Sequence, residues 1–180
     1  MSDFTVMRRI GIDAGHRLAD HGSKCRHLHG HRYEVEAVCR AREVTDAGEQ
    51  SGMVIDFGFL KEEMMRLIDA PCDHGLILSV DDAAMLRLFA PADQPFDAWH
   101  APLTEDVARH GYREVAGAAL GQKLYLVAAP PTAECLARHW FNRLAPAVAA
   151  RSDGRARLTS VRVWETPNCF AVYEQPADAS

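Results

Sequence analysis

Residues 24–31 decide how this chain is interpreted, and they read Lys24-Cys25-Arg26-His27-Leu28-His29-Gly30-His31. His29 and His31 are two positions apart, so in an extended strand their side chains point to the same side. Two imidazoles placed in this way can share one metal ion. Cys25 stands four residues before His29, close enough to face the same site.

A third imidazole is available from His16, in the run Ala14-Gly15-His16-Arg17-Leu18. Three neutral imidazoles with an open fourth position form the ligand set of a catalytic zinc site. Two other interpretations stay open at this point. Surface strands carry His-x-His pairs by chance, and Cys25 could close a structural zinc site as its fourth ligand.

The composition is that of an ordinary globular protein of 180 residues, with 48% apolar and 25% charged residues, and predicts one domain over residues 1–180. The net charge of −5 gives no support to nucleic-acid binding, which usually leaves a basic patch. No apolar run resembles a signal peptide or reaches transmembrane length, so we expect a cytoplasmic protein with no membrane partner. Five cysteines without paired spacing imply no disulfide framework.

Two strands are predicted at residues 4–15 and 29–42, where apolar and polar side chains alternate. His16 continues the apolar parity of the first strand. His29 and His31 share the apolar parity of the second. All three histidines are therefore predicted on the buried side of a sheet, close to strand ends.

Two helices are predicted to follow, each with a capping residue in front of it. Asp56 precedes apolar residues at helical spacing over 57–68, and Thr132 precedes a stripe of Leu136, Trp140 and Leu144. Pro146 is predicted to end or kink the second helix. His139 is predicted to be a surface or interface residue.

Two further strands follow a turn at residues 152–154, the second at Cys169–Glu174, with a disordered tail predicted from Pro176. Glu165 shares the parity of the buried valines before it, so a carboxylate is predicted to point inward at a strand end. Such a carboxylate needs a partner: an arginine, backbone amides, or a ligand with paired N–H donors. The element order predicts an α+β domain, a four-stranded antiparallel sheet with two helices on one face.

Six motifs in register carry a family resemblance that spans residues 4 to 173. They are Ala14-Gly15-His16-Arg17-Leu18, Lys24-Cys25 with His29-Gly30-His31, residues 52–57 (Gly-Met-Val-Ile-Asp-Phe), Asp73-His74, Pro131-Thr132-Ala133-Glu134 and Glu165-Thr166. In this order they resemble the 6-pyruvoyl-tetrahydropterin synthase / 6-carboxy-tetrahydropterin synthase family. The resemblance implies the tunnelling fold (T-fold), in which three subunits close their sheets into a barrel. It also implies a homo-oligomer, a trimer or a homohexamer, with active sites between subunits.

The resemblance assigns roles to individual residues. His16, His29 and His31 would hold Zn(2+), Cys25 would be the general base, and Asp73 with His74 would form a proton relay. Glu165 would bind the pterin ring, and Thr132 and Glu134 would lie near the pterin pocket. From the residues alone, Asp73-His74 is equally a loop feature, and Glu134 need only support the start of a helix. Candidates for binding the substrate triphosphate are Arg17, Lys24, Arg26 and Arg32.

The resemblance thins over residues 79–130, where family members usually have a much shorter connection, so we expect an insertion there. Within it, residues 82–89 and 104–110 are predicted as short helices, 90–102 as a proline-rich loop and 122–128 as a strand.

The expected product depends on the gap between Cys25 and His29. Three residues separate them, which resembles the 6-carboxy-tetrahydropterin synthases of queuosine and deazapurine biosynthesis. The implied reaction is a zinc-dependent carbon–carbon lyase that converts 7,8-dihydroneopterin triphosphate to 6-carboxy-5,6,7,8-tetrahydropterin, acetaldehyde and triphosphate. The alternatives are a 6-pyruvoyl-tetrahydropterin synthase, which eliminates triphosphate, and a non-catalytic zinc-binding protein.

Overall fold

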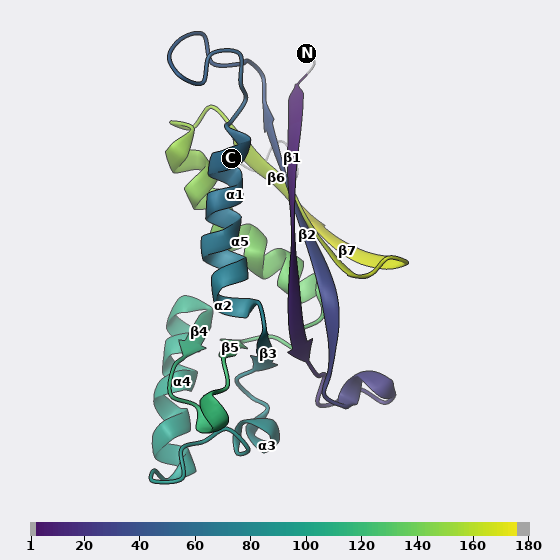
Figure 1. The fold of residues 1–180 in the computed structure, drawn as a ribbon, viewed down its shortest axis with the longest axis vertical. Coiled ribbons are helices and arrows are strands. Elements are labelled where there is room, and N and C mark those ends of the chain that lie inside the picture. The colour runs from purple at the N-terminus through teal and green to yellow at the C-terminus, as the bar shows by residue number, and fades with distance from the viewer. Residues whose placement is uncertain (1–2, 176–180) are drawn as a thin grey trace.

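The computed structural model describes residues 3–175, which form an α+β fold around one sheet with helices packed on it (Figure 1). The sheet has seven strands in the order β4-β5-β3-β1-β2-β6-β7. The strands are β1 (Phe4–His16), β2 (His29–Ala41), β3 (Gly75–Ser79), β4 (Tyr112–Val115), β5 (Leu124–Val127), β6 (Arg157–Thr166) and β7 (Cys169–Glu174). The helical segments are η1 (Lys24–Arg26), α1 (Phe57–Met64), η2 (Met65–Asp69), α2 (Ala70–Cys72), α3 (Ala83–Leu86), α4 (Phe96–His110), η3 (Ala119–Gly121) and α5 (Ala133–Arg151).

The long antiparallel pair β1–β2 forms the centre of the molecule and confirms the first two predicted strands. The register places Ala14 opposite His31 and His16 opposite His29. Alternate residues of both strands are buried, among them Ile12 and Tyr33, which are 0% exposed. Since side chains alternate between the two faces of a strand, the histidines lie on this same buried face.

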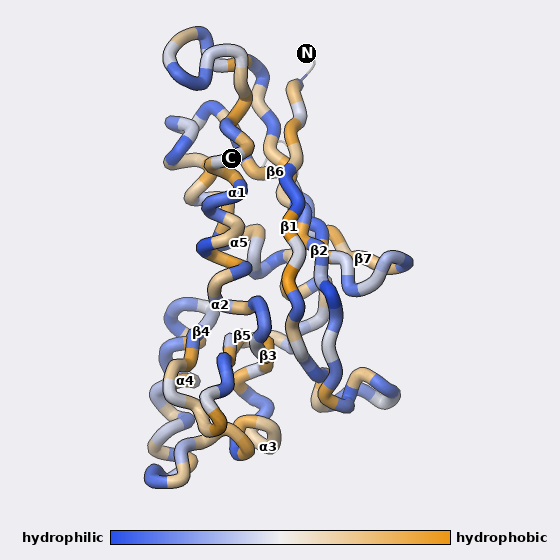
Figure 2. The backbone as a smooth tube through the Cα atoms, in the orientation of Figure 1, coloured by the Kyte–Doolittle hydropathy of each residue, from blue (hydrophilic) through white to orange (hydrophobic). Residues whose placement is uncertain are grey.

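The two predicted helices, α1 and α5, lie on one face of the sheet, as predicted, and their caps are the predicted ones. α3 and α4 pack on the other face of β3 and β5, against Leu78, Leu124 and Leu126. The Asp56 carboxylate accepts hydrogen bonds from the backbone N–H groups of Gly58 and Phe59 at the start of α1. The Thr132 hydroxyl accepts from the N–H of Cys135 at the start of α5. Hydrophobic and hydrophilic positions alternate along both helices (Figure 2), and the apolar side of α5 includes the fully buried Trp140.

The prediction of four strands was wrong, because the segment 79–130 and the residues just before it extend the same sheet. β3 lies parallel to the end of β1, and β5 and β4 follow it outward. The predicted strand at 122–128 is therefore confirmed. These strands, with α3 and α4, enclose a second hydrophobic core of their own.

The predicted loop at 90–102 was also wrong over its second half, since α4 begins at Phe96 and runs on to His110. Its proline-rich start suggested a loop, and Pro102 lies inside the helix. Trp99, Leu103 and Val107 are spaced four residues apart and are all buried in the second core. That apolar stripe outweighs the cost of the proline.

Pro146 does not end α5, which was one of the two outcomes predicted for it. The helix continues past Pro146 to Arg151, with Val148 fully buried against the core. His139 is partly buried, and its Nε2 lies 2.6 Å from the Tyr125 hydroxyl. The predicted tail from Pro176 lies outside the described residues. Over residues 3–175 there is no helix with the length and apolar character needed to cross a membrane.

Candidate metal centre and active site

Three histidines meet at the end of the β1–β2 pair. One ring nitrogen each from His16, His29 and His31 lies within 4.8 Å of the other two. The Nε2 atoms of His16 and His29 are 3.1 Å apart. Two nitrogens on one tetrahedral zinc lie about 3.4 Å apart, given Zn–N bonds of about 2.0–2.1 Å. The spacing of this donor set therefore fits a shared zinc ion.

The far sides of two of the rings are held by backbone carbonyls. His16 Nδ1 lies 2.8 Å from the Pro131 carbonyl oxygen, and His29 Nδ1 lies 2.7 Å from that of His27. A carbonyl can only accept, so each Nδ1 carries the proton and donates it. That tautomer leaves both Nε2 atoms with free lone pairs directed at each other, the arrangement that metal-binding histidines use.

Burial keeps two of these histidines neutral. His16 is 1% exposed, and burial lowers its pKa to about 4, helped by the neighbouring histidines and opposed by the Pro131 hydrogen bond. Burial also lowers the pKa of His31, although the nearby Glu165 carboxylate works in the opposite direction. Neutral imidazole is the form that binds a metal, so these two ligands need no deprotonation near pH 7.

The structure favours an open site over a closed one. Among residues 3–175, the group that could hold a metal consists of the three histidines, and Cys25 is not a member of it. Cys25 lies in η1, where it is partly exposed, and its carbonyl accepts a hydrogen bond from Leu18 N–H. Three imidazoles without the thiolate leave room for a substrate atom or water as the fourth ligand.

Tyr33 lies against the histidine cluster, and the charges of Glu165 and Cys25 act on its pKa. Burial raises the pKa of Tyr33, and the charges of Glu165 and Cys25 raise it further. Glu165 follows Trp164 at an irregularity in the β6–β7 pairing and is partly buried. The inward direction of the Glu165 side chain stays a prediction.

Tyr33 itself was missed in the sequence. Its ring packs edge-on against His16 and His31, at centroid distances of 5.8 and 5.3 Å. Its hydroxyl is buried and has no hydrogen-bond partner among the described residues. The available signal was its parity, since it follows His31 by two positions on the same face of the strand.

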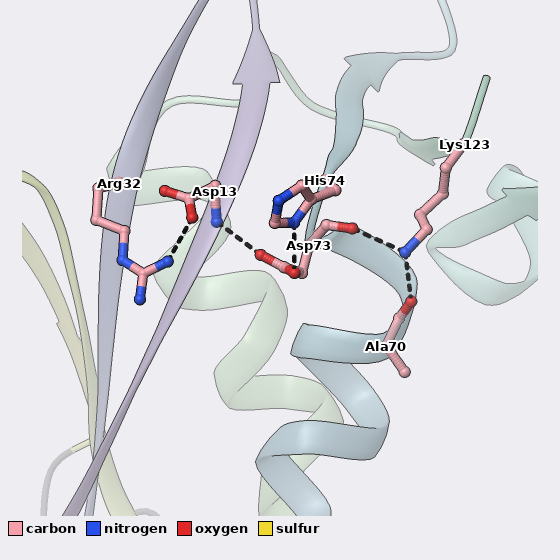
Figure 3. Close-up of polar contacts among 6 residues, drawn as sticks. All are labelled: Asp13, Arg32, Ala70, Asp73, His74 and Lys123. Carbon is pink, nitrogen blue, oxygen red and sulfur yellow. Dashed lines mark hydrogen bonds and ion pairs between the residues drawn. The ribbon is translucent and has the colours of Figure 1, made fainter.

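Asp73 and His74 form the interacting pair that the sequence suggested, in a turn between α2 and β3 (Figure 3). Asp73 Oδ2 lies 2.7 Å from His74 Nδ1, and Asp73 Oδ1 accepts a hydrogen bond from Asp13 N–H at 2.8 Å. That backbone hydrogen bond is the main cause of the lowered pKa of Asp73, and His74 lowers it further. The His74 side chain is 78% exposed.

The turn places His74 in an unusual backbone conformation. Its φ is +56°, in the left-handed region that non-glycine residues seldom adopt. The His74 N–H donates to the Asp13 carbonyl at 2.7 Å. Within residues 3–175 of one chain, no hydrogen bond joins His74 to Cys25 or to the three clustered histidines.

The remaining predicted binding residues have ordinary structural contacts. Thr132 caps α5, and Glu134 is exposed in the first turn of that helix. Arg17 is paired with the buried Asp82 through two hydrogen bonds of 2.5 and 2.7 Å, and Arg32 is paired with Asp13. The other proposed triphosphate ligands, Lys24 and Arg26, lie in η1 beside Cys25.

In sequence, the chain is similar to pterin synthases. A family model described as 6-pyruvoyl tetrahydropterin synthase matches residues 5–176. A 6-carboxy-5,6,7,8-tetrahydropterin synthase of Rickettsia conorii is 35% identical over 163 residues, covering 91% of this chain and 94% of the relative. The protein of the same name from Haemophilus influenzae is 30% identical over 172 residues, covering 96% and 99%. With such coverage, most of segment 79–130 lies inside the aligned range.

Solved structures share the fold at lower identity. An uncharacterised protein from Wolinella succinogenes superposes with a TM-score of 0.69 at 21% identity, covering 98% of this chain and 100% of the other. The 6-pyruvoyl tetrahydropterin synthase of Caenorhabditis elegans superposes with a TM-score of 0.57 at 23% identity, covering 98% of each chain. These likenesses confirm the predicted fold class.

Proposed function

The chain belongs to the 6-pyruvoyl tetrahydropterin synthase family, and from this premise we propose that it is a zinc-dependent 6-carboxy-tetrahydropterin synthase. The substrate would be 7,8-dihydroneopterin triphosphate, and the products 6-carboxy-5,6,7,8-tetrahydropterin, acetaldehyde and triphosphate. The observation that carries the proposal is the convergence of His16, His29 and His31 in a chain whose relatives of 30–35% identity bear that name.

The three histidines would hold zinc, which when bound supplies a Lewis acid for the oxygens of the substrate side chain. Cys25, as thiolate, would act as the general base that removes a side-chain proton. Asp73 would orient His74 through their 2.7 Å contact, so that His74 exchanges protons with the substrate.

Glu165 would fix the pterin ring, because a carboxylate can accept two parallel N–H donors such as the 2-amino and N3–H groups. A substrate ring that supplies those donors would also satisfy the partly buried carboxylate. Thr132 and Glu134, at the start of α5, would line the same pocket.

We further propose a cytoplasmic homo-oligomer, a trimer or homohexamer, that acts in queuosine or deazapurine biosynthesis. Exposed apolar residues at open strand edges support assembly. Phe170 and Val172 of the last strand, β7, are 47% and 41% exposed. Phe4 and Met7 are 52% and 43% exposed, and they lie in the part of β1 that β3 does not reach, since β3 pairs only with Ala14–His16. Strand edges and apolar side chains left open in one subunit are natural sites of contact with another.

The direct test is anaerobic incubation of the zinc-loaded protein with 7,8-dihydroneopterin triphosphate, followed by mass spectrometry and an acetaldehyde assay. A 6-carboxy pterin with acetaldehyde supports the proposal. The Cys25→Ala variant should keep its zinc and lose turnover. Substrate left intact by the zinc-loaded wild type would refute it.

The second candidate is the 6-pyruvoyl-tetrahydropterin synthase reaction, favoured by the description of the matching family model. It would give a 6-pyruvoyl product without acetaldehyde in the same assay. A non-catalytic zinc protein, with Cys25 as fourth ligand, predicts instead that Cys25→Ala loses zinc or fails to fold.

A further inference from the structure

Lys123 lies immediately before β5, in segment 79–130, and its side chain reaches across to the turn that carries Asp73 and His74 (Figure 3). Its Nζ donates hydrogen bonds to the Asp73 carbonyl at 2.7 Å and to the Ala70 carbonyl at 3.0 Å. Ala70 begins the three-residue helix α2 and Asp73 is its C-cap, so both carbonyls lie in a final helical turn, where backbone oxygens lack partners within the helix. A cation is favourable there because it also faces the negative end of the helix dipole.

The rest of Lys123 contacts the same turn. A Cβ added at Gly75 would lie 3.1 Å from Lys123 Cδ and 3.2 Å from Cγ, so the aliphatic stem covers Gly75 closely. The Lys123 carbonyl accepts a hydrogen bond from Leu76 N–H at 3.0 Å. One residue therefore holds the turn through its backbone, its stem and its charge.

The hydrogen bond from Lys123 to the Asp73 carbonyl matters because it holds the peptide bond between Asp73 and His74. The Asp73 carbonyl belongs to the peptide plane that leads into His74, whose φ of +56° is a conformation that persists only when surrounding contacts enforce it. Asp13 holds the other side of the turn through the His74 N–H and the Asp73 carboxylate. Lys123 supplies the opposing contact from β5.

We propose that Lys123 is a positioning residue, which fixes the Asp73–His74 turn so that the His74 ring is presented to substrate. It acts through the backbone of the turn and does not itself touch the substrate. The inference rests on the proposed function for its catalytic consequence, while its structural part stands on the contacts alone.

The experiment compares Lys123→Met, which keeps an apolar stem without the charge, with Lys123→Arg, which keeps a donor. Lys61→Met is the matched control, since Lys61 is an exposed lysine on α1. We measure amide hydrogen exchange by NMR at His74 and, as a reporter of global unfolding, at Val161 in β6. Bound zinc and steady-state kinetics are measured on the same samples.

We expect Lys123→Met to exchange at His74 about 10-fold faster, with Val161 and the zinc content unchanged, because the opening is local. The same variant should lower kcat about 10-fold at constant KM. Lys123→Arg should bring both the exchange rate at His74 and kcat most of the way back to the wild-type values. Lys61→Met should match wild type in both measurements.

Unchanged exchange at His74 in Lys123→Met would overturn the proposal, whatever happens to turnover, because a lost rate would then mean direct contact with substrate. Faster exchange at His74 and Val161 together would overturn it as well, since that is general destabilisation. A wild type without turnover would refute the proposed function but leave the exchange comparison as a test of the structural part.

Discussion

His16 Nδ1 and the Pro131 carbonyl oxygen lie 2.8 Å apart, although the two residues are 115 positions apart in the chain. The connection before α5 thereby fixes the ring of a histidine at the end of β1. The site is assembled from two distant segments, and its ligand atoms are oriented before a metal arrives. Pre-oriented ligands of this kind raise metal affinity.

The first prediction concerns the metal ligands. His31→Ala should weaken zinc binding by at least about 100-fold, since it removes one of three ligand nitrogens. His27→Ala is the control: it lies in the same run, and among residues 3–175 its hydrogen bond to the cluster comes from its backbone carbonyl, which the substitution keeps. Zinc binding of the two variants is compared by measuring their zinc content after dialysis against a competing chelator. Equal losses from the two variants would mean that the cluster is not the zinc site.

The second prediction concerns Glu165. Glu165→Gln should keep zinc and fold but reduce kcat/KM for the pterin substrate by about 10- to 100-fold, because a hydrogen bond to a charged group contributes roughly 1.5–3 kcal/mol. The loss should fall mainly on KM, since the ring is bound before the side chain reacts. Glu174→Gln, an exposed carboxylate on the adjacent strand, serves as the control. A Glu165→Gln enzyme with wild-type KM would exclude Glu165 from ring binding.

Local patterns predicted the parts of the fold that depend on residues close in sequence. Alternation placed His16 and His31 on the buried face, and the caps at Asp56 and Thr132 were identified because a side chain and its own backbone decide them. The sheet extension could not be predicted in this way. β3 and β5 pair in parallel with strands far along the chain, and their register depends on contacts that a linear pattern does not contain.

The same limit applies within the site. The residue types at positions 16, 29 and 31 indicate a metal, but nothing in the sequence near Arg17 reveals that it pairs with Asp82 rather than with a ligand. The partner of a charged side chain is decided by packing. Lys123 was overlooked for that reason too, because its contacts are with backbone carbonyls of residues about 50 positions away.

The third prediction follows from the pair Arg17–Asp82. Asp82 is 4% exposed at its side chain and also caps α3, so removing Arg17 leaves a buried charge unpaired. Arg17→Met should lower the free energy of unfolding by about 3 kcal/mol. Arg32→Met, which breaks the exposed pair with Asp13, should lower it by less than about 1 kcal/mol. Urea denaturation measures the free energy of unfolding of both variants. Similar losses in the two variants would contradict the structural role of Arg17.

The fourth prediction is a pH dependence of stability at His139. Its pKa is lowered to about 4 by burial and then by Arg143. Arg143 donates to the Tyr125 hydroxyl at 2.8 Å, which leaves that hydroxyl to donate to the neutral His139 ring. The unfolded chain binds the proton near pH 6.5, so stability is complete above that value and falls as the pH drops towards 4.

The comparison uses His139→Gln, which can still accept from Tyr125 but does not titrate. Between pH 7 and 4, wild type should lose up to about 3 kcal/mol more unfolding free energy than the variant, from about 1.4 kcal/mol per unit of pKa shift. Contributions shared by both proteins, including those of the zinc site, cancel in the difference. Parallel stability curves over this range would show that folding does not change the pKa of His139, which would contradict the prediction.

The last prediction concerns how Cys25 and His74 come together. The His74 side chain is 78% exposed, and the structure shows no hydrogen bond from it to Cys25 within residues 3–175 of one chain. If active sites lie between subunits, His74 of one copy can complete the site that contains Cys25 of another. Cys25→Ala and His74→Ala should then each be inactive alone. Co-expressed with different affinity tags and purified as a mixed oligomer, they should recover roughly a quarter of wild-type turnover, the share of interfaces with both groups intact under random assembly. If both groups serve a site within one chain, no mixture contains an intact site, and the mixed oligomer should be as inactive as its parents. A variant with both substitutions, mixed with wild type, calibrates the assembly statistics.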